Sequence, residues 1–408
     1  MRIAFFNSYD SGGGASRSAL RLANQLNKDV ELSVNMFVRF KQENNKNVYK
    51  LKEPIIVKAL NFIASILDSY IFSKIVKNTK LFWSISILPR FYSKKQVFNE
   101  YDILHVHWLG NEFISSNMFY KFNKTIIWTF HDSAPFTGGC HIPLDCNKYT
   151  NGCKDCSQIK YSFLCRRMIK KKKRYWSDMK IVIVCPSKWL AHCAEKSEVF
   201  KKKPIFVIPN GIDCVQYKPI EKSIAKKVLN LVGTTKYILF GAINSTQDIN
   251  KGFDILLDAL SKVKLENTEI IVFGSNCSDL ADHIPIKINF IGSLHDEISL
   301  SLLYSAANLF VCPSRSENLP NTILESMACG TPVVGFNIGG IPDIIDHKVN
   351  GYLATPFSSD DLAQGINWIL EDENRYSQLS AKAREKVSNC FNIDTVAQKY
   401  KHLYKSYC

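Results

Sequence analysis

Two carboxylates stand eight positions apart in one short stretch of the chain. Glu317 and Glu325 lie within SRSENLPNTILESMACGTPVVG, residues 314–335. This stretch predicts a strand, a turn, a helix and a second strand over 309–312, 313–320, 321–328 and 332–336. In a parallel sheet, Glu317 would follow the carboxyl end of a strand, and Glu325 would lie on the first turns of the next helix. Open α/β sheets bind ligands at that edge, where free helix amides favour phosphate.

Three further features supply groups that could hold an anion. Lys251 carries a positive charge, and residues 318–321 offer main-chain amides before the predicted helix. Gly12, Gly13 and Gly14 follow the first predicted strand, where missing side chains let the main chain approach an anion. A simple tight turn is the alternative explanation of the three glycines.

Alternating strands and helices would position these groups. Short apolar runs, typical of buried strands, cover 2–7, 32–38, 103–107, 125–130, 181–185, 205–208, 237–241, 269–273, 287–291, 309–312 and 332–336. Helical spacing covers the segments 16–26, 360–370 and 376–404. The alternation predicts an α/β fold with two Rossmann-like, doubly wound parallel sheets. With 408 residues, 46% of them hydrophobic, the chain suits two domains of about 200 residues each.

Several motifs resemble those of retaining, nucleotide-sugar-dependent glycosyltransferases of the GT-B fold, which form family 4 or glycosyl transferases group 1. The E-x7-E signature of that family is similar to Glu317 and Glu325 with Pro320, Ala328, Gly330, Pro332 and Val333. The other motifs follow in the family's order: SGGGA at 11–15, TFHD at 129–132, IPNGID at 208–213, KGFD at 251–254 and GG at 339–340. The resemblance extends from residue 2 to about residue 390.

The resemblance implies two Rossmann-like domains that face each other across a cleft. Residues 1–217 would form an acceptor-side domain that includes the cysteine-rich loop 138–156. Residues 218–390 would bind the nucleotide sugar. Residues 391–408 would form a helix that crosses back to the first domain.

The implied reaction moves a sugar from a nucleoside diphosphate to a hydroxyl group. Negative charge grows on the departing diphosphate, and fixed cations and dipoles stabilise it. The candidate catalytic residues are Lys251, Glu317 and His131, of which His131 would donate a hydrogen bond near the transferred sugar. The candidate donor-binding residues are Gly13, Gly14, Asn318, Leu319, Pro320, Asn321 and Glu325, and Glu325 would accept hydrogen bonds from the ribose hydroxyls. Same-face attack, in which the departing phosphate takes the acceptor proton, would retain the anomeric configuration without a protein base.

Two features bear on how the diphosphate is held. The sequence contains no Asp-x-Asp pair that would bind a divalent cation, so no catalytic metal is expected. Many relatives have an arginine directly after the glycine that ends the first strand of the second domain, but here Ala242 follows Gly241. Because a bidentate cation is missing there, either Lys251 and the amides suffice or another basic group takes its place.

Structural explanations compete with each of these assignments. Glu325 could be a solvated helix residue and Glu317 a capping carboxylate, although their placement around Pro320 favours a site. His105 and His107 alternate along a predicted strand and are expected to be structural.

The loop 138–156 contains four cysteines, Cys140, Cys146, Cys153 and Cys156. Core packing does not explain four thiols in one polar loop, and the final C-x2-C has the spacing of a zinc knuckle. The wider spacing of the earlier cysteines departs from common zinc fingers, so structural zinc, free thiols and a disulfide remain alternatives. The insertion resembles one in family members of exopolysaccharide and O-antigen assembly, which implies a role in surface polysaccharide biosynthesis.

The net charge of +15 requires an explanation, and the densest basic run is Arg166–Arg174. Such a run is usually a solvated helix face. The sharper alternative is an anionic membrane, to which each basic residue contributes about 1 kcal/mol. The apolar stretch 55–75 and the segment 81–88 could add shallow insertion or be ordinary core helix. Nucleic acid is not an expected partner, because no binding motif is present and no aromatic residues interleave with the basic run.

We expect a cytoplasmic protein that can bind the inner face of the plasma membrane. Lys58, Asn61 and Asp68 interrupt the best apolar run, 55–72, so no segment is expected to span a bilayer. The apolar residues at the amino terminus are too few for a signal peptide.

Two other functions fit the same fold. A sugar-nucleotide epimerase would be another class of enzyme, although the E-x7-E pattern with Lys251 favours transfer. A non-catalytic scaffold is the second alternative, prompted by Ala242. For a transferase, the expected acceptor is a glycan or a polyprenyl-diphosphate-linked glycan.

Overall fold

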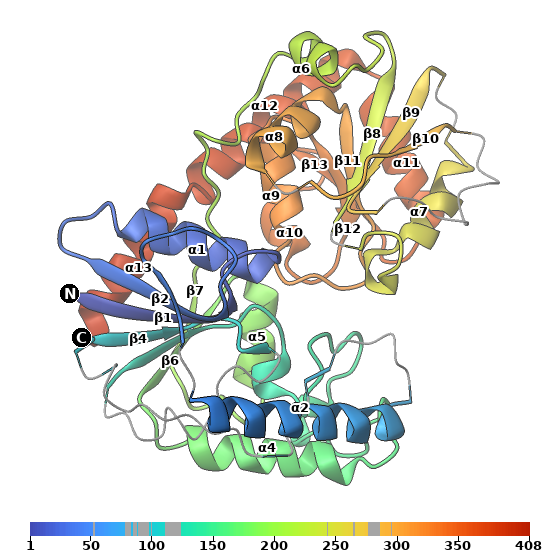
Figure 1. The fold of residues 1–408 in the computed structure, drawn as a ribbon. Coiled ribbons are helices and arrows are strands. Elements are labelled where there is room, and N and C mark those ends of the chain that lie inside the picture. The colour runs from blue at the N-terminus through green and yellow to red at the C-terminus, as the bar shows by residue number, and fades with distance from the viewer. Residues whose placement is uncertain are drawn as a thin grey trace. The chain divides into compact units, whose positions relative to one another are not determined.

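The computed structural model describes residues 1–51, 54–77, 83–84, 88, 98, 100–110, 124–242, 244–263, 266–275, 286–294 and 296–408. The chain divides into two compact units, both of which are drawn in Figure 1. Unit 1 consists of Met1–Pro209 and Ala397–Cys408, and unit 2 consists of Asn210–Val396.

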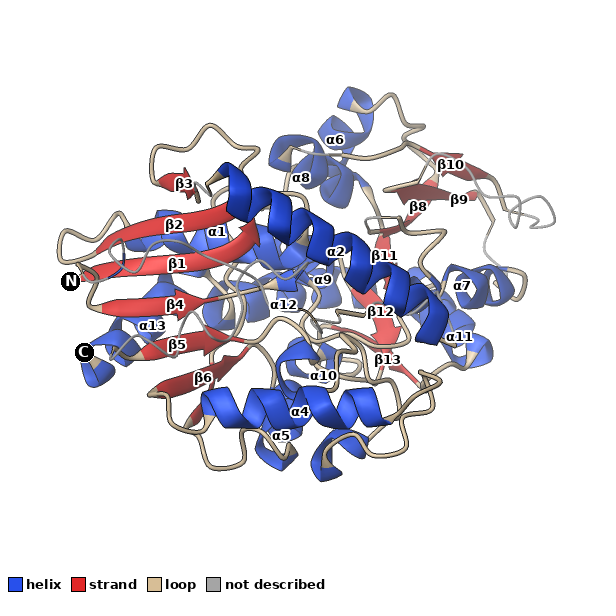
Figure 2. Cartoon of the chain, turned by 60° about the horizontal axis from the view of Figure 1, so that its bottom comes forward, coloured by secondary structure: helices blue, strands red, loops and turns tan. Residues whose placement is uncertain are grey.

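Unit 1 is built on a seven-stranded parallel sheet with the order β3-β2-β1-β4-β5-β6-β7. Its strands are β1 (Arg2–Tyr9), β2 (Ser33–Phe40), β3 (Val48–Lys50), β4 (Ile103–Val106), β5 (Ile126–Thr129), β6 (Ile181–Cys185) and β7 (Ile205–Val207). Its helices are α1 (Gly14–Leu26), α2 (Ile55–Ile75), α4 (Phe163–Trp176) and α5 (Lys188–Lys196), with the short 3-10 helices η3 (Ala134–Phe136) and η4 (Lys148–Asn151). Figure 2 shows this sheet with α2 in front of it.

Both faces of the unit 1 sheet are covered, which explains why its strands read as continuous apolar runs. On one face, Phe6, Trp128 and Ile183 pack with residues of α4 and α5 in a core rich in aromatic side chains. On the other face lies the end of α13 (Ile393–Tyr407), where the Tyr404 hydroxyl is 2.7 Å from Nδ1 of His105. In Figure 1, α1 and α13 lie on the opposite side of the sheet from α2 and α4.

Unit 2 is built on a six-stranded parallel sheet with the order β10-β9-β8-β11-β12-β13. Its strands are β8 (Lys236–Gly241), β9 (Thr268–Phe273), β10 (Ile288–Phe290), β11 (Leu309–Cys312), β12 (Val333–Phe336) and β13 (Gly351–Ala354). Its helices are α6 (Lys222–Val228), α7 (Phe253–Leu260), α8 (Glu297–Ala306), α9 (Asn321–Ala328), α10 (Ile341–Ile344), α11 (Ser359–Leu370) and α12 (Glu373–Cys390), with the 3-10 turn η5 (Ile249–Lys251). One core packs the sheet against α8, α9 and α12, and a second packs it against α7 and α11. The sheet is therefore covered on both faces.

The predicted fold class, with two doubly wound parallel sheets, is confirmed. Two strands escaped prediction, because β3 has only three residues and β13 reads GYLA, which is no apolar run. The segment 376–404, which has helical spacing throughout, is split between α12 and α13. The split occurs where the Ile212 amide donates to the Phe391 carbonyl and the Ile393 amide donates to the Ile212 carbonyl. This pairing holds Ile212 in unit 2, whose first residue is Asn210, whereas the prediction placed the domain boundary at 217.

The prediction that no stretch is long and apolar enough to span a bilayer is wrong. Helix α2 has 21 residues and passes that test by length and composition alone, because one lysine and one aspartate in its apolar stretch do not make it polar. Only 17% of that stretch is buried inside the protein. It is therefore not an ordinary core helix.

Candidate functional site

The unit 2 sheet reverses its winding direction between β8 and β11. From β8 the chain adds β9 and β10 on one side, and it then returns to add β11, β12 and β13 on the other side. Open α/β sheets bind ligands beyond the carboxyl ends of their strands at such a point. The segments that follow β8 and β11 contain Lys251 and Glu317, respectively.

Lys251 and Glu317 form a salt bridge, in which Nζ of the lysine lies 2.7 Å from Oε1 of the glutamate. Both side chains are mostly shielded, with 24% of the lysine and 15% of the glutamate exposed. Burial alone would lower the pKa of Lys251, but the charge and the hydrogen bond of Glu317 outweigh burial and raise that pKa above its usual value. The ammonium therefore stays charged at neutral pH, in surroundings that contain less water than the open surface.

The two segments that contain the pair are connected through their main chains. The Arg315 amide donates to the Asn250 carbonyl at 2.7 Å, and the Asn250 side chain donates to the Ser316 carbonyl at 2.9 Å. Gly252 has a φ of +70°, and a Cβ there would lie 2.0 Å from the Pro313 carbonyl oxygen. The close approach of these two loops fixes the distance between Lys251 and Glu317.

The glycine pair of the GG motif supports Glu317 from the other side. The Gly340 amide donates to the Glu317 carbonyl at 3.1 Å. Gly339 has a φ of +54°, and a Cβ there would lie 2.0 Å from the same oxygen. No other residue fits this position without moving the backbone of Glu317.

Arg315 is a charged residue of this loop that the sequence did not single out. Its guanidinium contacts both carboxylate oxygens of Asp254, at 2.9 and 2.6 Å. This hydrogen bonding lowers the pKa of Asp254. Arg315 precedes Glu317 of the E-x7-E motif by two residues, and Asp254 ends the KGFD motif. These positions next to two motifs were the signal in the sequence that could have identified the pair. The pair strengthens the loop connection and leaves Lys251 as the cation next to Glu317.

Glu325 is buried on α9, with 3% of the residue exposed, so it is not a solvated helix residue. Its Oε2 accepts a hydrogen bond from the Tyr304 hydroxyl at 3.2 Å. Helix α9 begins after Pro320, whose side chain cannot cap the helix. The side-chain amide of Asn210 donates hydrogen bonds to the Leu319 carbonyl at 3.3 Å and to Oδ1 of Asn321 at 3.1 Å. Asn210 comes from the IPNGID motif, which the structure therefore brings to the amino end of α9.

The carboxyl ends of the unit 1 strands carry the other predicted residues. The glycine turn joins β1 to α1, with Gly12 at a φ of +91° and Gly13 in an extended conformation before the first helical residue, Gly14. A Cβ on Gly13 would meet no atom within 4 Å. The missing side chain of Gly13 is therefore not required by packing, which distinguishes it from Gly252 and Gly339.

His131 follows β5 at the same edge of the sheet. Its Nε2 lies 3.1 Å from Nδ1 of His107, and the two rings are stacked with centroids 5.3 Å apart. Burial lowers the pKa of His131 to about 4, although the negative charge of Asp132 partly opposes this shift. His131 is therefore neutral at physiological pH and can donate one hydrogen bond and accept another.

Asp132 organises a network around this histidine. Its Oδ2 accepts hydrogen bonds from Nε1 of Trp108 at 2.7 Å and from Nδ1 of His141 at 2.5 Å. Burial alone would raise the pKa of Asp132, but the charge and hydrogen bonding of His141 prevail and lower it. The sequence analysis did not single out His141, which lies next to Cys140 in the cysteine-rich loop. Asp132 thus attaches that loop to the edge that presents His131.

The four cysteines of the loop are free thiols, and a fifth joins them from α4. Cys165 forms a hydrogen bond with Cys156, which lowers the pKa of Cys156 to about 6. Burial raises the pKa of Cys140 to about 12. Within the described residues, no group of three or more His, Cys, Asp or Glu side chains is arranged to hold a metal ion. Zinc at Cys140, Cys146, Cys153 and Cys156 therefore stays a prediction.

Comparison with known proteins identifies the family. The model of glycosyltransferase family 4 matches residues 12–216, and the model of glycosyl transferases group 1 matches residues 222–386. The chain belongs to glycosyltransferase family 4. The predicted family resemblance is thereby confirmed, and the candidate residues of each unit fall within the matched ranges.

Curated relatives of this family member come from archaea and bacteria. An uncharacterized glycosyltransferase of Methanocaldococcus jannaschii is 30% identical over 45% of this chain and 48% of its own length. The lipopolysaccharide 1,2-N-acetylglucosaminetransferase of Salmonella typhimurium is 26% identical over 57% of this chain and 63% of its own length. The chain spans only about half the length of the first few curated relatives that it matches.

Solved structures with the same fold cover the family member over its whole length. Sucrose-phosphate synthase from Thermosynechococcus elongatus superimposes with a TM-score of 0.68 at 20% identity, over 99% of this chain and 98% of that one. The Anabaena protein HepE, solved in complex with UDP-glucose, gives a TM-score of 0.68 at 18% identity, over 100% of both chains. At these identities the likeness shows the fold alone.

Proposed function

We propose that this protein is a retaining glycosyltransferase that moves a sugar from a nucleoside-diphosphate sugar to a hydroxyl group without a catalytic metal. The proposal rests on the Lys251–Glu317 pair next to the amino end of α9, at the reversal point of the unit 2 sheet. Glu317 holds the ammonium in place before any donor arrives, and a charge oriented in advance stabilises a leaving diphosphate most effectively. The first amides of α9 add a partial positive charge.

The rest of the donor has candidate contacts in both units. We propose that Glu325, oriented by the Tyr304 hydroxyl, accepts hydrogen bonds from the ribose. His131, which is neutral, is the proposed hydrogen-bond donor to the transferred sugar. Glu317 and the loop up to Asn321 would contact the same sugar.

The relatives support this substrate class. HepE was solved with UDP-glucose, and a relative in Corynebacterium glutamicum is a GDP-mannose-dependent mannosyltransferase that acts on a phosphatidylinositol mannoside. With the lipopolysaccharide enzyme of Salmonella, they support a glycan or lipid-linked acceptor in surface polysaccharide biosynthesis. We propose a polyprenyl-diphosphate-linked glycan or a growing glycan as the acceptor and the cytoplasm as the location.

Thermal unfolding with a series of nucleoside diphosphates tests the donor assignment first. A ligand at 100 times its dissociation constant stabilises the folded protein by about 2.7 kcal/mol, so the matching nucleotide should raise the midpoint clearly. The corresponding sugar nucleotide is then incubated with a chelator and a lipid-linked acceptor, and the anomeric configuration of the product is read by NMR. Retention in the presence of the chelator is expected, whereas an inverted product or a strict need for a divalent cation would contradict the proposal.

The same assay separates the two alternative functions. Epimerisation of the sugar without any acceptor would favour an epimerase of this fold. A protein that neither binds a nucleotide nor hydrolyses a donor would be a scaffold that has lost activity, as the alanine at position 242 suggested.

The cysteine-rich loop has its own test. If Cys140, Cys146, Cys153 and Cys156 hold a structural zinc, the purified protein should contain about one zinc per chain. A variant with Cys153→Ser and Cys156→Ser should lose that zinc and unfold at a lower temperature. The exposed Cys390→Ser and Cys408→Ser substitutions serve as the control. A zinc-free, fully folded protein would show that the thiols act without metal.

A further inference from the structure

Helix α2 exposes most of its large apolar residues and buries Asn61 and Asp68, the reverse of an ordinary surface helix. The large apolar side chains on its outer face are at least 44% exposed and comprise Ile55, Ile56, Leu60, Phe62, Ile63, Ile66, Leu67 and Tyr70. Its buried residues are Asn61, Ala64, Asp68 and Ile75. At 3.6 residues per turn, the exposed and buried sets lie on faces about 150° apart.

The polar residues on the buried face are held inside unit 1. The carboxylate of Asp68 accepts a hydrogen bond from the Leu88 amide at 3.3 Å. At the end of the helix, the Lys160 amide donates to the Ile75 carbonyl at 2.7 Å, and the Lys77 amide donates to the Gln158 carbonyl at 2.9 Å. These hydrogen bonds at Asp68 and at the end of the helix fix the orientation of α2, and the apolar face of the helix points away from unit 1.

The buried residues also show how α2 can meet a membrane. Asn61 and Ile75 are 14 positions apart, so the helix lies against unit 1 over about 21 Å of its length. A helix attached in this way cannot stand across a bilayer while unit 1 stays folded. It can lie in the plane of the membrane surface, with one face in the lipid.

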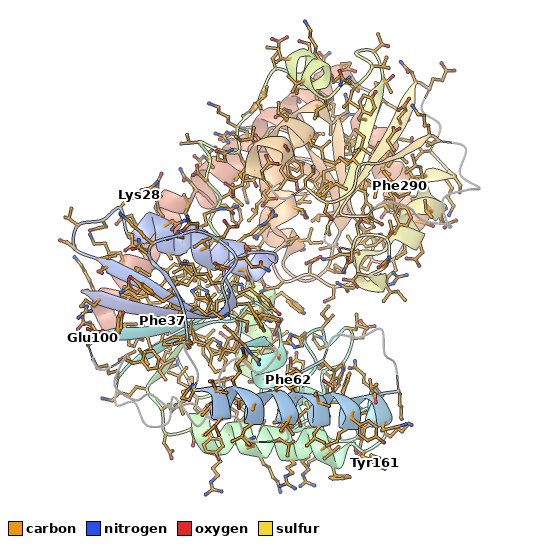
Figure 3. The ribbon with its side chains drawn as sticks, in the orientation of Figure 1. Lys28, Phe37, Phe62, Glu100, Tyr161 and Phe290 are labelled. Carbon is orange, nitrogen blue, oxygen red and sulfur yellow. The ribbon has the colours of Figure 1, made fainter. Side chains whose placement is uncertain are left out.

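Helix α4 supplies the complementary charge. Its exposed positions form one stripe along the helix, occupied by Phe163, Arg166, Arg167, Lys170, Lys173 and Arg174. The helix contains no acidic residue, and within the described residues Arg166, Arg167 and Lys170 form no salt bridge. Figure 3 shows nitrogen-tipped side chains that extend from α4 away from the sheet.

The two helices belong to one surface. The segment that pairs with the end of α2, at Ile159, leads directly into α4, so the end of one helix lies next to the start of the other. In Figures 1 and 2, both helices lie on the same side of the unit 1 sheet, and Figure 3 labels Phe62 on α2 and Tyr161 just before α4. An apolar face of this length next to a basic stripe is typical of helices that bind anionic lipid.

We propose that α2 and the basic face of α4 form a docking surface for an anionic lipid bilayer. The apolar side chains of α2 enter the boundary between headgroups and acyl chains, while the basic side chains of α4 contact the headgroups. This inference is independent of the proposed transfer reaction, because it needs neither donor nor acceptor.

Co-sedimentation of the full chain with vesicles tests the proposal. Vesicles that contain 30% phosphatidylglycerol are compared with pure phosphatidylcholine, and at least about tenfold tighter binding to the anionic vesicles is expected, reduced by 0.5 M salt. The change Phe62→Ser, Ile63→Ser, Ile66→Ser should weaken binding about 10- to 100-fold. A similar loss is expected for Arg166→Gln, Arg167→Gln, Lys170→Gln.

Matched controls use exposed residues elsewhere on the chain. Val215→Ser, Val232→Ser, Ile298→Ser should leave vesicle binding within about twofold of the wild type, as should Lys201→Gln, Lys202→Gln, Lys218→Gln. Far-UV circular dichroism and thermal unfolding establish that each variant is folded. A variant of the α2 face that fails to fold is replaced by the single change Phe62→Ser, for which a loss of about 3- to 10-fold is expected.

Three results would overturn the proposal. Equal binding to neutral and anionic vesicles would remove the role of α4. Concentration-dependent dimers that disappear in the α2 variant would show that a second copy of this chain covers the apolar face. Resistance of the membrane-bound protein to alkaline carbonate would show that α2 is inserted as a span rather than docked in the plane of the surface. None of these results affects the donor-binding test, so the two proposals fail independently.

Discussion

Units 1 and 2 have the same kind of sheet but present different chemistry at the carboxyl ends of their strands. Unit 2 places a charged pair there, Lys251 and Glu317, and a buried carboxylate, Glu325. Unit 1 places there glycines and His131, which burial keeps neutral, while the carboxylate of Asp132 is occupied by Trp108 and His141. A diphosphate needs fixed positive charge, whereas the hydroxyl groups of a sugar can bind to neutral donors and acceptors as well as to carboxylates. The difference between the units therefore lies in their loops, because fold alone does not determine function.

Loss of the charged pair in unit 2 should have the largest effect on catalysis. Lys251→Ala removes the charge that we propose meets the leaving diphosphate, and kcat should fall about 10²- to 10³-fold or more. The loss of kcat in Glu317→Ala should be similarly large, because this change releases the ammonium of Lys251 and removes the proposed contact to the donor. Steady-state kinetics with the sugar nucleotide measures both changes.

An exposed salt bridge of the same unit is the control for this prediction. Lys262 pairs with Asp258 at 3.1 Å on the surface, and Lys262→Ala should leave kcat unchanged. If the kcat of Lys251→Ala equals that of the wild type and of Lys262→Ala, the Lys251–Glu317 pair does not stabilise the leaving group.

A smaller loss is expected when the buried carboxylate of unit 2 is neutralised. Glu325→Gln keeps the shape of the side chain but weakens the hydrogen bonds that we propose it accepts from ribose, so the KM for the donor should rise about 10- to 100-fold. Tyr304→Phe removes only the hydroxyl that orients Glu325, and its KM should rise less. A change in kcat with an unaltered KM would instead place Glu325 outside the ribose contact.

The sequence predicted the elements around this site more completely than the contacts within it. The strand 309–312 and the helix 321–328 have the predicted bounds, because Pro320 and Gly330 give clear local signals. The pairing of Arg315 with Asp254 and of Glu325 with Tyr304 joins residues 61 and 21 positions apart, and no local pattern reports such contacts. The orientation of α2 was also beyond prediction, since composition does not say which face of an apolar helix is buried.

The glycine turn of unit 1 offers a test that separates ligand approach from folding. Gly13 has an extended conformation and open space where a Cβ would be, so Gly13→Ala should not change the unfolding midpoint. If a ligand approaches the main chain there, the added methyl group should lower kcat/KM about tenfold. Gly233→Ala, which also meets no atom within 4 Å, should change neither quantity.

Gly339→Ala provides the opposite case in unit 2. A Cβ there would collide with the Glu317 carbonyl oxygen, so both the unfolding midpoint and activity should fall.

The prediction for unit 1 is contradicted if Gly13→Ala has the kcat/KM of the wild type. The glycines of unit 1 would then form only a simple tight turn.

The smallest effect is expected from the neutral histidine of unit 1, and it depends on pH. The pKa of His131 is about 4 in the folded protein and about 6.5 in an unfolded chain, so the unfolded chain binds the proton more tightly between these values. The folded protein is therefore destabilised relative to the unfolded chain as the pH falls from 6.5 to 4.

The variant His131→Gln cannot be protonated at this position. Its free energy of unfolding should therefore decline less than that of the wild type between pH 6.5 and pH 4, whereas the exposed control His402→Gln should follow the wild type. Chemical unfolding at pH 7, 6, 5 and 4 measures the difference, and the kcat of His131→Gln at pH 7 should fall only about 3- to 10-fold because glutamine retains a hydrogen-bond donor. Parallel stability curves for His131→Gln and the wild type would show that the pKa of His131 is the same in the folded and the unfolded protein, and the contrast between the charged Lys251 and the neutral His131 would then be lost below pH 6.5.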